Sequence, residues 1–301
     1  MKLRVNAKLG NKFKPVTASL ALATVGAAML ALAGVGAQAQ PAVPSQVSAA
    51  EAATYADLVD LAERSDLVIR AEIRRQIAVE PERAPGLAPG FARLYIEART
   101  QALLAGRSAL GESLVYLVDV PLDARGKVPK LKDRVMLLFA DAVPGRPGSI
   151  QLTGKNAQLD YSPELEARLR PILTALVAGD TPPKITGIRD ALAVEGTLTG
   201  ESETQIFLST GSRTPVSISV LRRPGQRPVW GVSWGEIIDS AARPPSPETL
   251  RWYRLACALP ERLPSNANLA RDPAARRLAE ADYAFVVDAL GPCARAITEP
   301  A

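Results

Sequence analysis

The chain of 301 residues contains no histidine, and this absence excludes several kinds of active site. Ser-His-Asp and Cys-His catalysis use imidazole as the base, and H-E-x-x-H zinc sites and His-ligated haem, copper or non-haem iron use it as a ligand. The sequence also lacks a glycine-rich phosphate loop, a dinucleotide fingerprint and a D-x-[DN]-x-[DN]-G calcium loop. We therefore predict a protein that is not an enzyme and that binds no cofactor and no metal.

Cysteine is scarce as well, because the chain has only Cys257 and Cys293. In an oxidising compartment an even pair of cysteines is typical of one disulfide. Two free thiols or a redox pair are the alternatives, and the spacing is not the C-x-x-C of a redox pair. We predict a structural Cys257–Cys293 disulfide, which leaves almost no soft ligand for a transition metal.

Acidic residues are missing from the first 40 positions, where Lys2, Arg4, Lys8, Lys12 and Lys14 precede an apolar run over residues 16–37. The run ends at Ala37-Gln38-Ala39, a small-x-small cleavage site. These features predict a Sec-type signal peptide over residues 1–39, cleaved after Ala39, and a periplasmic or extracellular location. An uncleaved anchor helix is the alternative, because the run is long enough to span a bilayer.

The apparent positive charge of the chain belongs to this leader. The chain has 36 Lys and Arg against 31 Asp and Glu, and the five basic residues before Gln40 leave 31 of each sign in the rest. A neutral mature chain gives no electrostatic reason to bind nucleic acid or an anionic membrane. We predict neither partner.

The first part of the mature chain has the pattern of a small β-barrel. Residues 40–53 are rich in Ala and Pro and predict a flexible tether, and Thr54 begins a capping box for a short helix. The expected strands are residues 67–79, 93–99, 114–120, 135–139 and 150–152, of which 114–120 is apolar on both faces and therefore predicted to be central. Arg75 interrupts the apolar face of the first strand and predicts a bulge. Ser162-Pro163 begins a helix that Pro171 should kink or split.

Two segments in this region carry a resemblance to a known family. Ser65-Asp66-Leu67-Val68-Ile69-Arg70-Ala71-Glu72-Ile73, followed after a turn by Val135-Met136-Leu137-Leu138-Phe139, resembles the OB-like barrels of netrin-module type found in secreted proteins. The resemblance covers residues 54–155, which lack the paired cysteines of that module. It implies an OB-like fold for the barrel and, as an alternative function, protease inhibition.

The second part begins after a Gly- and Pro-containing boundary at residues 179–183. Strands are expected at residues 192–194 and 205–208 and in a hairpin over residues 215–236, followed by helices that begin at Ser246-Pro247 and Asp272-Pro273. The predicted fold is α+β: an N-terminal OB-like antiparallel β-barrel with a trailing helix (residues 54–180), then an antiparallel sheet packed against two disulfide-linked helices (residues 181–301).

The hairpin holds the candidate binding residues. Arg222, Arg223 and Arg227 flank its Pro224-Gly225 turn, and they either receive an anionic group or are solvated and paired with acids such as Glu201 and Glu203. Trp230 and Trp234 on the return strand either offer a stacking surface or pack in the core. The Gly231-Val-Ser-Trp-Gly235 match to a nucleophile elbow is a coincidence, because no histidine is available and the match lies in a strand.

These observations favour a non-catalytic secreted or periplasmic envelope module that binds an envelope protein or a glycan, or has a structural role. The alternatives are the protease inhibitor and a carboxylate-dependent polysaccharide hydrolase. A hydrolase needs two carboxyl groups across a cleft, one with a raised pKa, and the candidates are Glu201, Glu203, Glu236 and Asp239.

Overall fold

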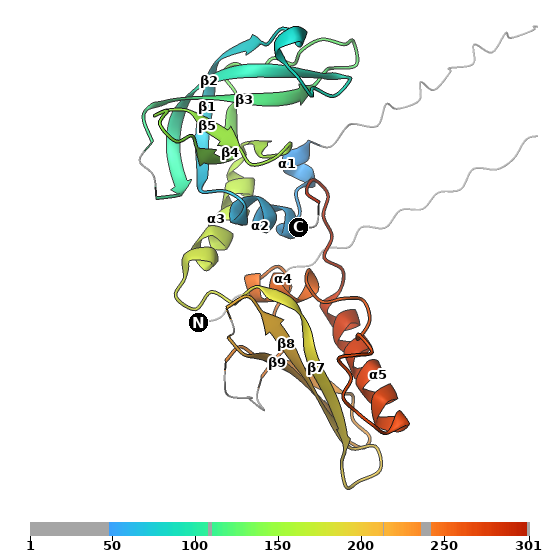
Figure 1. Ribbon diagram of the computed structural model, residues 1–301. Coiled ribbons are helices and arrows are strands. Elements are labelled where there is room, and N and C mark those ends of the chain that lie inside the picture. Colours follow the sequence, from blue (N-terminus) through green and yellow to red (C-terminus); the bar gives the residue numbers. More distant parts are fainter. Residues whose placement is uncertain (1–47, 108–109, 213, 236–241, 300–301) are drawn as a thin grey trace, which may run out of the picture. The chain divides into compact units, whose positions relative to one another are not determined.

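The computed structural model describes residues 48–107, 110–212, 214–235 and 242–299, which form an α+β fold with two antiparallel sheets (Figure 1). The predicted signal peptide (residues 1–39) lies outside the described residues, as does the tether up to residue 47. Within the described end of the tether, Ser48 caps the short helix α1, Ala49–Ala52, through a capping box. No helix in the described part of the chain is both long and apolar enough to cross a membrane.

The first sheet is curled into a half-barrel. Its strands are β1 (Leu67–Ala78), β2 (Phe91–Ala105), β3 (Ser113–Pro121), β4 (Val135–Ala142), β5 (Ile150–Leu152) and β6 (Gln158–Asp160). The strand order is β3-β2-β1-β4-β5, with β6 also paired to β4. The short helix η1, Pro81–Arg83, lies in the loop between β1 and β2.

The alternation of apolar side chains in β1 serves two cores. Leu67, Ile69, Ala71 and Ile73 point into the half-barrel, where they join buried residues of β2, β3 and β4. Val68 on the opposite face belongs to a second cluster that includes the helix α2, Tyr55–Glu63. The register of β1 against β2 shifts between Ile73 and Arg75, so the predicted bulge is confirmed, and Arg75 reaches solvent beside Glu97.

The prediction of a central strand at residues 114–120 is wrong. β3 is an edge strand of the sheet, and the side chain of Leu117 on its outer face is 52% exposed. Only the inner face, with Leu114, Tyr116 and Val118, is buried. The apolar residues on the outer face of β3 therefore do not indicate a central position in the sheet.

Helix α3, Pro163–Val177, begins as predicted, because the Ser162 side chain accepts a hydrogen bond from the Leu165 N–H and Pro163 occupies the first turn. Pro171 lies inside the helix without splitting it. Buried Glu166 accepts hydrogen bonds from Arg70 of β1 and from Arg170 one turn along, so α3 is fixed to the half-barrel by charge as well as by packing.

The second sheet is a four-stranded meander in the order β10-β9-β8-β7, with strands β7 (Ile185–Glu195), β8 (Ser202–Thr210), β9 (Val216–Arg222) and β10 (Val229–Ser233). The predicted hairpin is confirmed as β9–β10. Its turn is closed by a hydrogen bond from the Gln226 N–H to the Arg223 carbonyl, and Gly225 adopts a φ of +70°. Such a φ is the conformation that a glycine at this turn position supplies.

Two helices complete the fold, α4 (Leu250–Ala256) and α5 (Pro273–Leu290), and α5 lies along β7 and β8 (Figure 1). α5 begins at Asp272 and ends at Gly291 as predicted. The predicted start of α4 at Ser246 is wrong, because Glu248 has a φ of +53° and Thr249 caps the helix instead. The Cys257–Cys293 disulfide is confirmed and joins the ends of the two helices.

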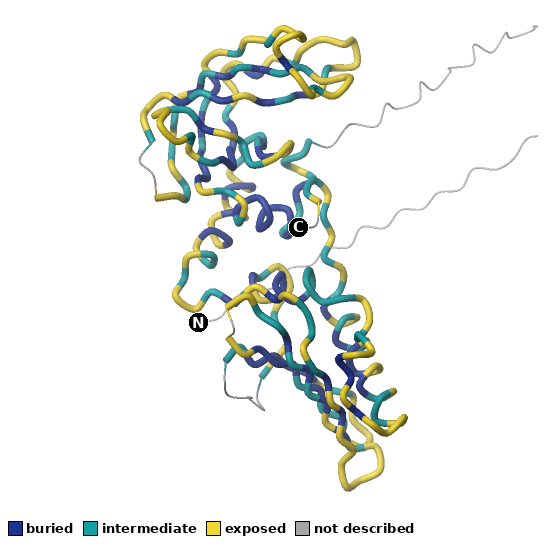
Figure 2. Tube along the Cα trace, viewed as in Figure 1, coloured by how far each residue is buried: buried dark blue, intermediate teal, exposed yellow. Residues whose placement is uncertain are grey.

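The end of the chain is held by two carboxylates of α2, a helix whose residues are mostly buried (Figure 2). Asp57 accepts hydrogen bonds from the backbone N–H groups of residues 296, 297 and 298 as well as from Thr54, its own helix cap. Asp60 accepts hydrogen bonds from Arg295 and from Tyr253 of α4. Burial raises the pKa of Asp57, but its hydrogen bonds outweigh burial and lower the pKa to about 2.

Residues Gln46–Ala301 form one compact unit. One hydrophobic cluster contains buried residues from both sides of the predicted boundary at residue 180, including Leu58, Leu169, Ile218 and Tyr283. The division into two domains at that boundary stays a prediction.

Replacing both cysteines with serine removes a constraint on the unfolded chain across a loop of 36 residues. We expect the free energy of unfolding to fall by about 4 kcal/mol on the chain-entropy estimate. Urea unfolding of the wild type with and without reductant measures the same loss and serves as the control. A wild type that unfolds at the same urea concentration in both conditions would contradict a stabilising disulfide.

The lowered pKa of Asp57 predicts a pH-dependent stability. Since the folded pKa lies below the usual 3.8, ionised Asp57 stabilises the protein above pH 4, and this contribution is lost as the pH falls through about 2. We expect Asp57→Asn to be about 2 kcal/mol less stable than the wild type at pH 7, with the difference shrinking between pH 4 and pH 2. Asp180→Asn, at a side chain that is 83% exposed, is the control and should match the wild type at every pH.

Candidate binding cleft

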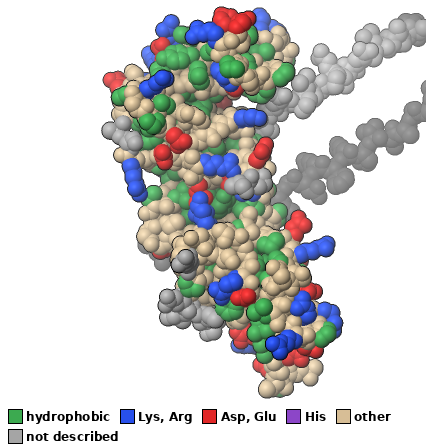
Figure 3. Space-filling view, viewed as in Figure 1, with side chains coloured by type: hydrophobic (Ala, Val, Ile, Leu, Met, Phe, Trp, Pro, Cys, Tyr) green, Lys and Arg blue, Asp and Glu red, His purple; other side chains and the backbone are tan. Residues whose placement is uncertain are grey.

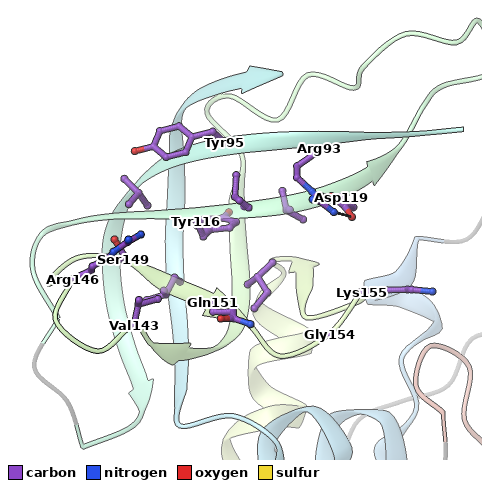
Figure 4. A pocket seen from close by; sticks show the side chains of 15 residues that line it. Arg93, Tyr95, Tyr116, Asp119, Val143, Arg146, Ser149, Gln151, Gly154 and Lys155 are labelled. Atoms are coloured by element: carbon purple, nitrogen blue, oxygen red, sulfur yellow. Dashed lines mark hydrogen bonds and ion pairs between the residues drawn. The ribbon is translucent and has the colours of Figure 1, made fainter. Parts of the chain in front are cut away.

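The two edge strands of the half-barrel meet at one point and then separate. Val115 of β3 forms a parallel bridge with Ser149, and its N–H donates to the Gly148 carbonyl over 2.8 Å. Beyond this bridge the strands leave a cleft of about 600 Å³. Figure 4 shows its lining from β2, β3, the β4–β5 loop and the residues of β5 and just after it.

Part of the backbone of β3 faces this cleft. The N–H and C=O groups of successive strand residues point to opposite edges of the strand. The Leu122 N–H bonds the Gly90 carbonyl next to β2, so the even-numbered residues of β3 direct their backbone groups toward β2. The odd-numbered residues direct theirs away from β2, as the Val115 N–H does. Leu117 and Asp119 therefore present their backbone groups to the cleft. Pro121, at the end of β3, has no N–H to offer there.

The same argument applies to β5 on the other side. The Val143 N–H bonds the Ser149 carbonyl, and the Thr153 N–H bonds the Phe139 carbonyl. The odd-numbered residues from 149 to 153 therefore direct their backbone groups toward β4. The backbone groups of Leu152 therefore point away from β4 and toward the cleft. In the order of the sheet, both β3 and β5 are terminal strands.

The walls of the cleft combine apolar and aromatic side chains. Leu117 is exposed, and Tyr95 beside it on β2 is half-buried. Tyr116 points inward, and its hydroxyl donates a hydrogen bond to the side-chain oxygen of Gln158 over 2.7 Å. Burial raises the pKa of Tyr116, so it is a neutral hydrogen-bonding group at any physiological pH.

The charges of the cleft are arranged unevenly. Arg93 binds both carboxylate oxygens of Asp119, at 2.7 and 2.8 Å, and this hydrogen bonding lowers the pKa of Asp119. Arg146 and Lys155 are exposed at opposite ends of the cleft (Figure 4). Neither of these two cations forms an ion pair with a described residue. With Asp119 neutralised by Arg93, the cleft is positively charged.

The resolved pKa shifts of the described carboxyl groups all have the same direction. Every described carboxyl group whose pKa departs from its usual range has it lowered, not raised: Asp57, Asp60, Glu63, Glu72, Asp119 and Glu166. A general acid at neutral pH needs a raised pKa. Among the described residues, no three His, Cys, Asp or Glu side chains gather in a way that would hold a metal ion.

The predicted arginines of the hairpin do not share one environment. Arg223 and Arg227 are exposed at the turn, but Arg222 binds Asp282 of α5 at 2.6 Å. Asp282 is fully buried and also accepts a hydrogen bond from Thr204 of β8. The partner of Arg222 is therefore neither Glu201 nor Glu203, and its contact ties the second sheet to α5.

The two predicted tryptophans also differ. Trp230 is 8% exposed and belongs to the core, so of the two alternatives for this residue the structure supports packing in the core. Trp234 lies just beyond β10, half-buried, with the Arg251 guanidinium 5.9 Å from its ring centroid. A second cavity, of about 670 Å³, lies beside Trp230 and is lined by Glu203, Leu221 and Val229 among others.

The first three residues of the nucleophile-elbow match, Gly231 to Ser233, lie in β10, and the last two follow directly after the strand. Gly231 has a packing role there, because a Cβ atom at this position would lie 2.2 Å from the Ala242 carbonyl oxygen. Of the candidate carboxylates, Glu201 accepts a hydrogen bond from the Leu198 N–H and Glu203 accepts one from the Gln205 side chain. Glu236 and Asp239 lie outside the described residues.

The cleft was not predicted from the sequence, although the sequence contains one signal for it. A strand that is apolar on both faces has its outer face either covered by the protein or available to a partner. At residues 114–120 the outer face is available, since Leu117 is exposed on an edge strand.

Comparison with known proteins adds no relative: neither a protein-family model nor a curated protein matches this chain.

The contact between Arg222 and Asp282 yields a matched pair of variants. Arg222→Met leaves a buried carboxylate without its cation, and we expect the free energy of unfolding to fall by about 2 kcal/mol, since Arg222 is partly exposed. Arg223→Met, the neighbouring exposed arginine, should change it by less than about 0.5 kcal/mol. Urea unfolding of both variants makes the comparison, and equal losses would contradict a structural role specific to Arg222.

Proposed function

We propose that the protein is a non-catalytic binding module of the cell envelope whose cleft between β3 and β5 receives a macromolecular partner. The observation that carries the proposal is an exposed apolar side chain, Leu117, on an edge strand whose backbone groups open into a cleft of about 600 Å³. Ligand sites combine apolar walls with a few placed polar groups. Tyr95 and Tyr116 with the Arg93–Asp119 pair supply both.

The fold proposed for this part is the OB-like barrel that the resemblance implies. The strand order, with β5 returning beside β3 through a parallel bridge, supports it. OB-folds bind their ligands on the face of strands 2 and 3 and on the loop between strands 4 and 5. The cleft uses the corresponding elements, since β2, β3 and the β4–β5 loop line it.

The proposed location is periplasmic or extracellular. The basic and apolar leader over residues 1–39 supports export, and the disulfide is compatible with an oxidising compartment. Acidic and basic side chains are interspersed over the face in Figure 3, in keeping with a neutral mature chain and with a partner that is not nucleic acid.

The hydrolase alternative receives no support from the lowered carboxyl pKa values described above. The protease-inhibitor alternative rests on the loop before β2, where Arg93 donates to the Pro85 carbonyl over 3.2 Å. No contact of that loop distinguishes an inhibitory segment from an ordinary connection, so binding at the cleft is the function we propose.

A photo-crosslinking amino acid placed at Leu117 tests this proposal in living cells, with the full exported chain. We expect a covalent adduct of defined mass from position 117 and none from Leu269, which is equally exposed (54%) but does not line the cleft. Excess unlabelled wild type should compete the adduct away, whereas unlabelled Leu117→Asp should not. Equal labelling from both positions, or none from either, would reject the cleft as the binding site.

A further inference from the structure

Resting on the proposed function, the geometry of the cleft points to the class of ligand: we propose an extended, acidic segment of a protein that adds as a strand to the edge of β3. The backbone groups, the side chains and the charges of the cleft between β3 and β5 each favour this ligand.

The backbone groups select an extended polypeptide. Leu117 and Asp119 of β3 direct alternating N–H and C=O groups into the cleft, and Leu152 of β5 does so from the other side. Only another extended chain supplies donors and acceptors at the matching spacing, which is the basis of peptide binding by strand addition. A sugar chain offers hydroxyl groups without that alternation.

The extent of the open edge sets the length of the segment. The edge is used by the bridge at Val115 and ends at Pro121, which has no N–H. The residues between them span roughly 16 Å at about 3.3 Å per residue. A segment of about five residues therefore fills the open edge.

The side chains on this edge differ from those that normally protect an edge strand. Proteins protect exposed edges with lysine, proline, bulges or inward-pointing charges. On β3 the protection is limited to Pro121 at the end, because the charge of Asp119 is bound by Arg93 and Leu117 is apolar and exposed. An apolar side chain of the segment would contact Leu117 and Tyr95.

The charges select an acidic segment. Arg93 and Asp119 neutralise each other, which leaves Arg146 and Lys155 at the two ends of the cleft without an ionic partner among the described residues. Carboxylates near both ends of a bound segment would pair with them. A segment carrying Lys or Arg would instead meet two like charges.

The test uses the chain purified after export and a displayed library of random octapeptides. We expect the selected peptides to be acidic, to lack proline and to alternate β-branched or aromatic with polar residues. Arg146→Glu with Lys155→Glu should weaken their binding at least tenfold. Arg125→Glu with Lys127→Glu, at exposed cations of the β3–β4 loop outside the cleft, should leave binding unchanged.

Hydrogen exchange gives the direct readout of strand addition. With a selected peptide bound, the amide hydrogens of Leu117 and Asp119 should exchange at least tenfold more slowly, while that of Val118, which faces β2, should not change. Binding of oligouronates or other glycans without this protection would overturn strand addition. A concentration-dependent dimer of the chain that occupies the cleft would overturn a segment of another protein as the ligand.

The remaining outcomes separate this inference from the proposed function. If the selected peptides are neutral or basic, and if they bind the Arg146→Glu, Lys155→Glu variant as tightly as the wild type, the ligand is not acidic. Crosslinking at Leu117 together with no peptide binding would leave a binding cleft but reject a peptide ligand. Failure of both crosslinking and selection would reject the cleft altogether.

Discussion

Two buried carboxylates in one short helix hold together segments from both ends of the chain. Asp57 and Asp60 lie in α2, whose apolar residues Leu58 and Val59 are fully buried. Burying these charges is tolerable because each is surrounded by donors: the helix cap, the backbone of residues 296–298, Arg295 and Tyr253. The disulfide at Cys293 fixes the same tail to α4. The position of the C-terminal segment thus depends on a few charge-assisted hydrogen bonds next to one covalent link.

The core of the half-barrel, unlike helix α2, contains no buried carboxylate among the described residues of its hydrophobic cluster. Its buried cluster is built from apolar side chains together with Tyr116, whose hydroxyl bonds Gln158, and its strands pair with one another from β3 round to β5. The sheet closes at a single bridge, so that two edges face each other across the cleft. Exposed Leu117 at the open edge is consistent with a partner that completes the pairing.

The sequence predicted the elements well where local chemistry decides them. Capping residues gave the starts of α2, α3 and α5, alternation gave the hairpin of β9 and β10, and the misplaced charge of Arg75 gave a bulge. It failed where two nearby capping signals compete and where a choice depends on distant residues. Ser246-Pro247 looks like a helix start, but Thr249 takes that role, and the position of β3 in the sheet follows from strand pairing that no local pattern encodes.

The candidate site was the least predictable part for the same reason. The hairpin arginines and tryptophans stand out in the sequence. Arg222, however, forms an ion pair with Asp282, 60 residues further along the chain, and Trp230 is buried in the core. The cleft forms where β3 and β5 approach each other from well-separated segments, and none of its side chains is unusual alone. Tertiary proximity, rather than residue type, defines it.

The hydrogen bonds of Asp57 also constrain the order in which the protein can be assembled. The donors at residues 296–298 follow this carboxylate by about 240 positions. A ribosome or a translocation channel delivers the chain from its N-terminus, so the strands of the half-barrel emerge well before these donors do. The Asp57 carboxylate therefore stays hydrated until residues 296–298 have been delivered, and a chain that stops before them lacks the contacts that allow this carboxylate to be buried.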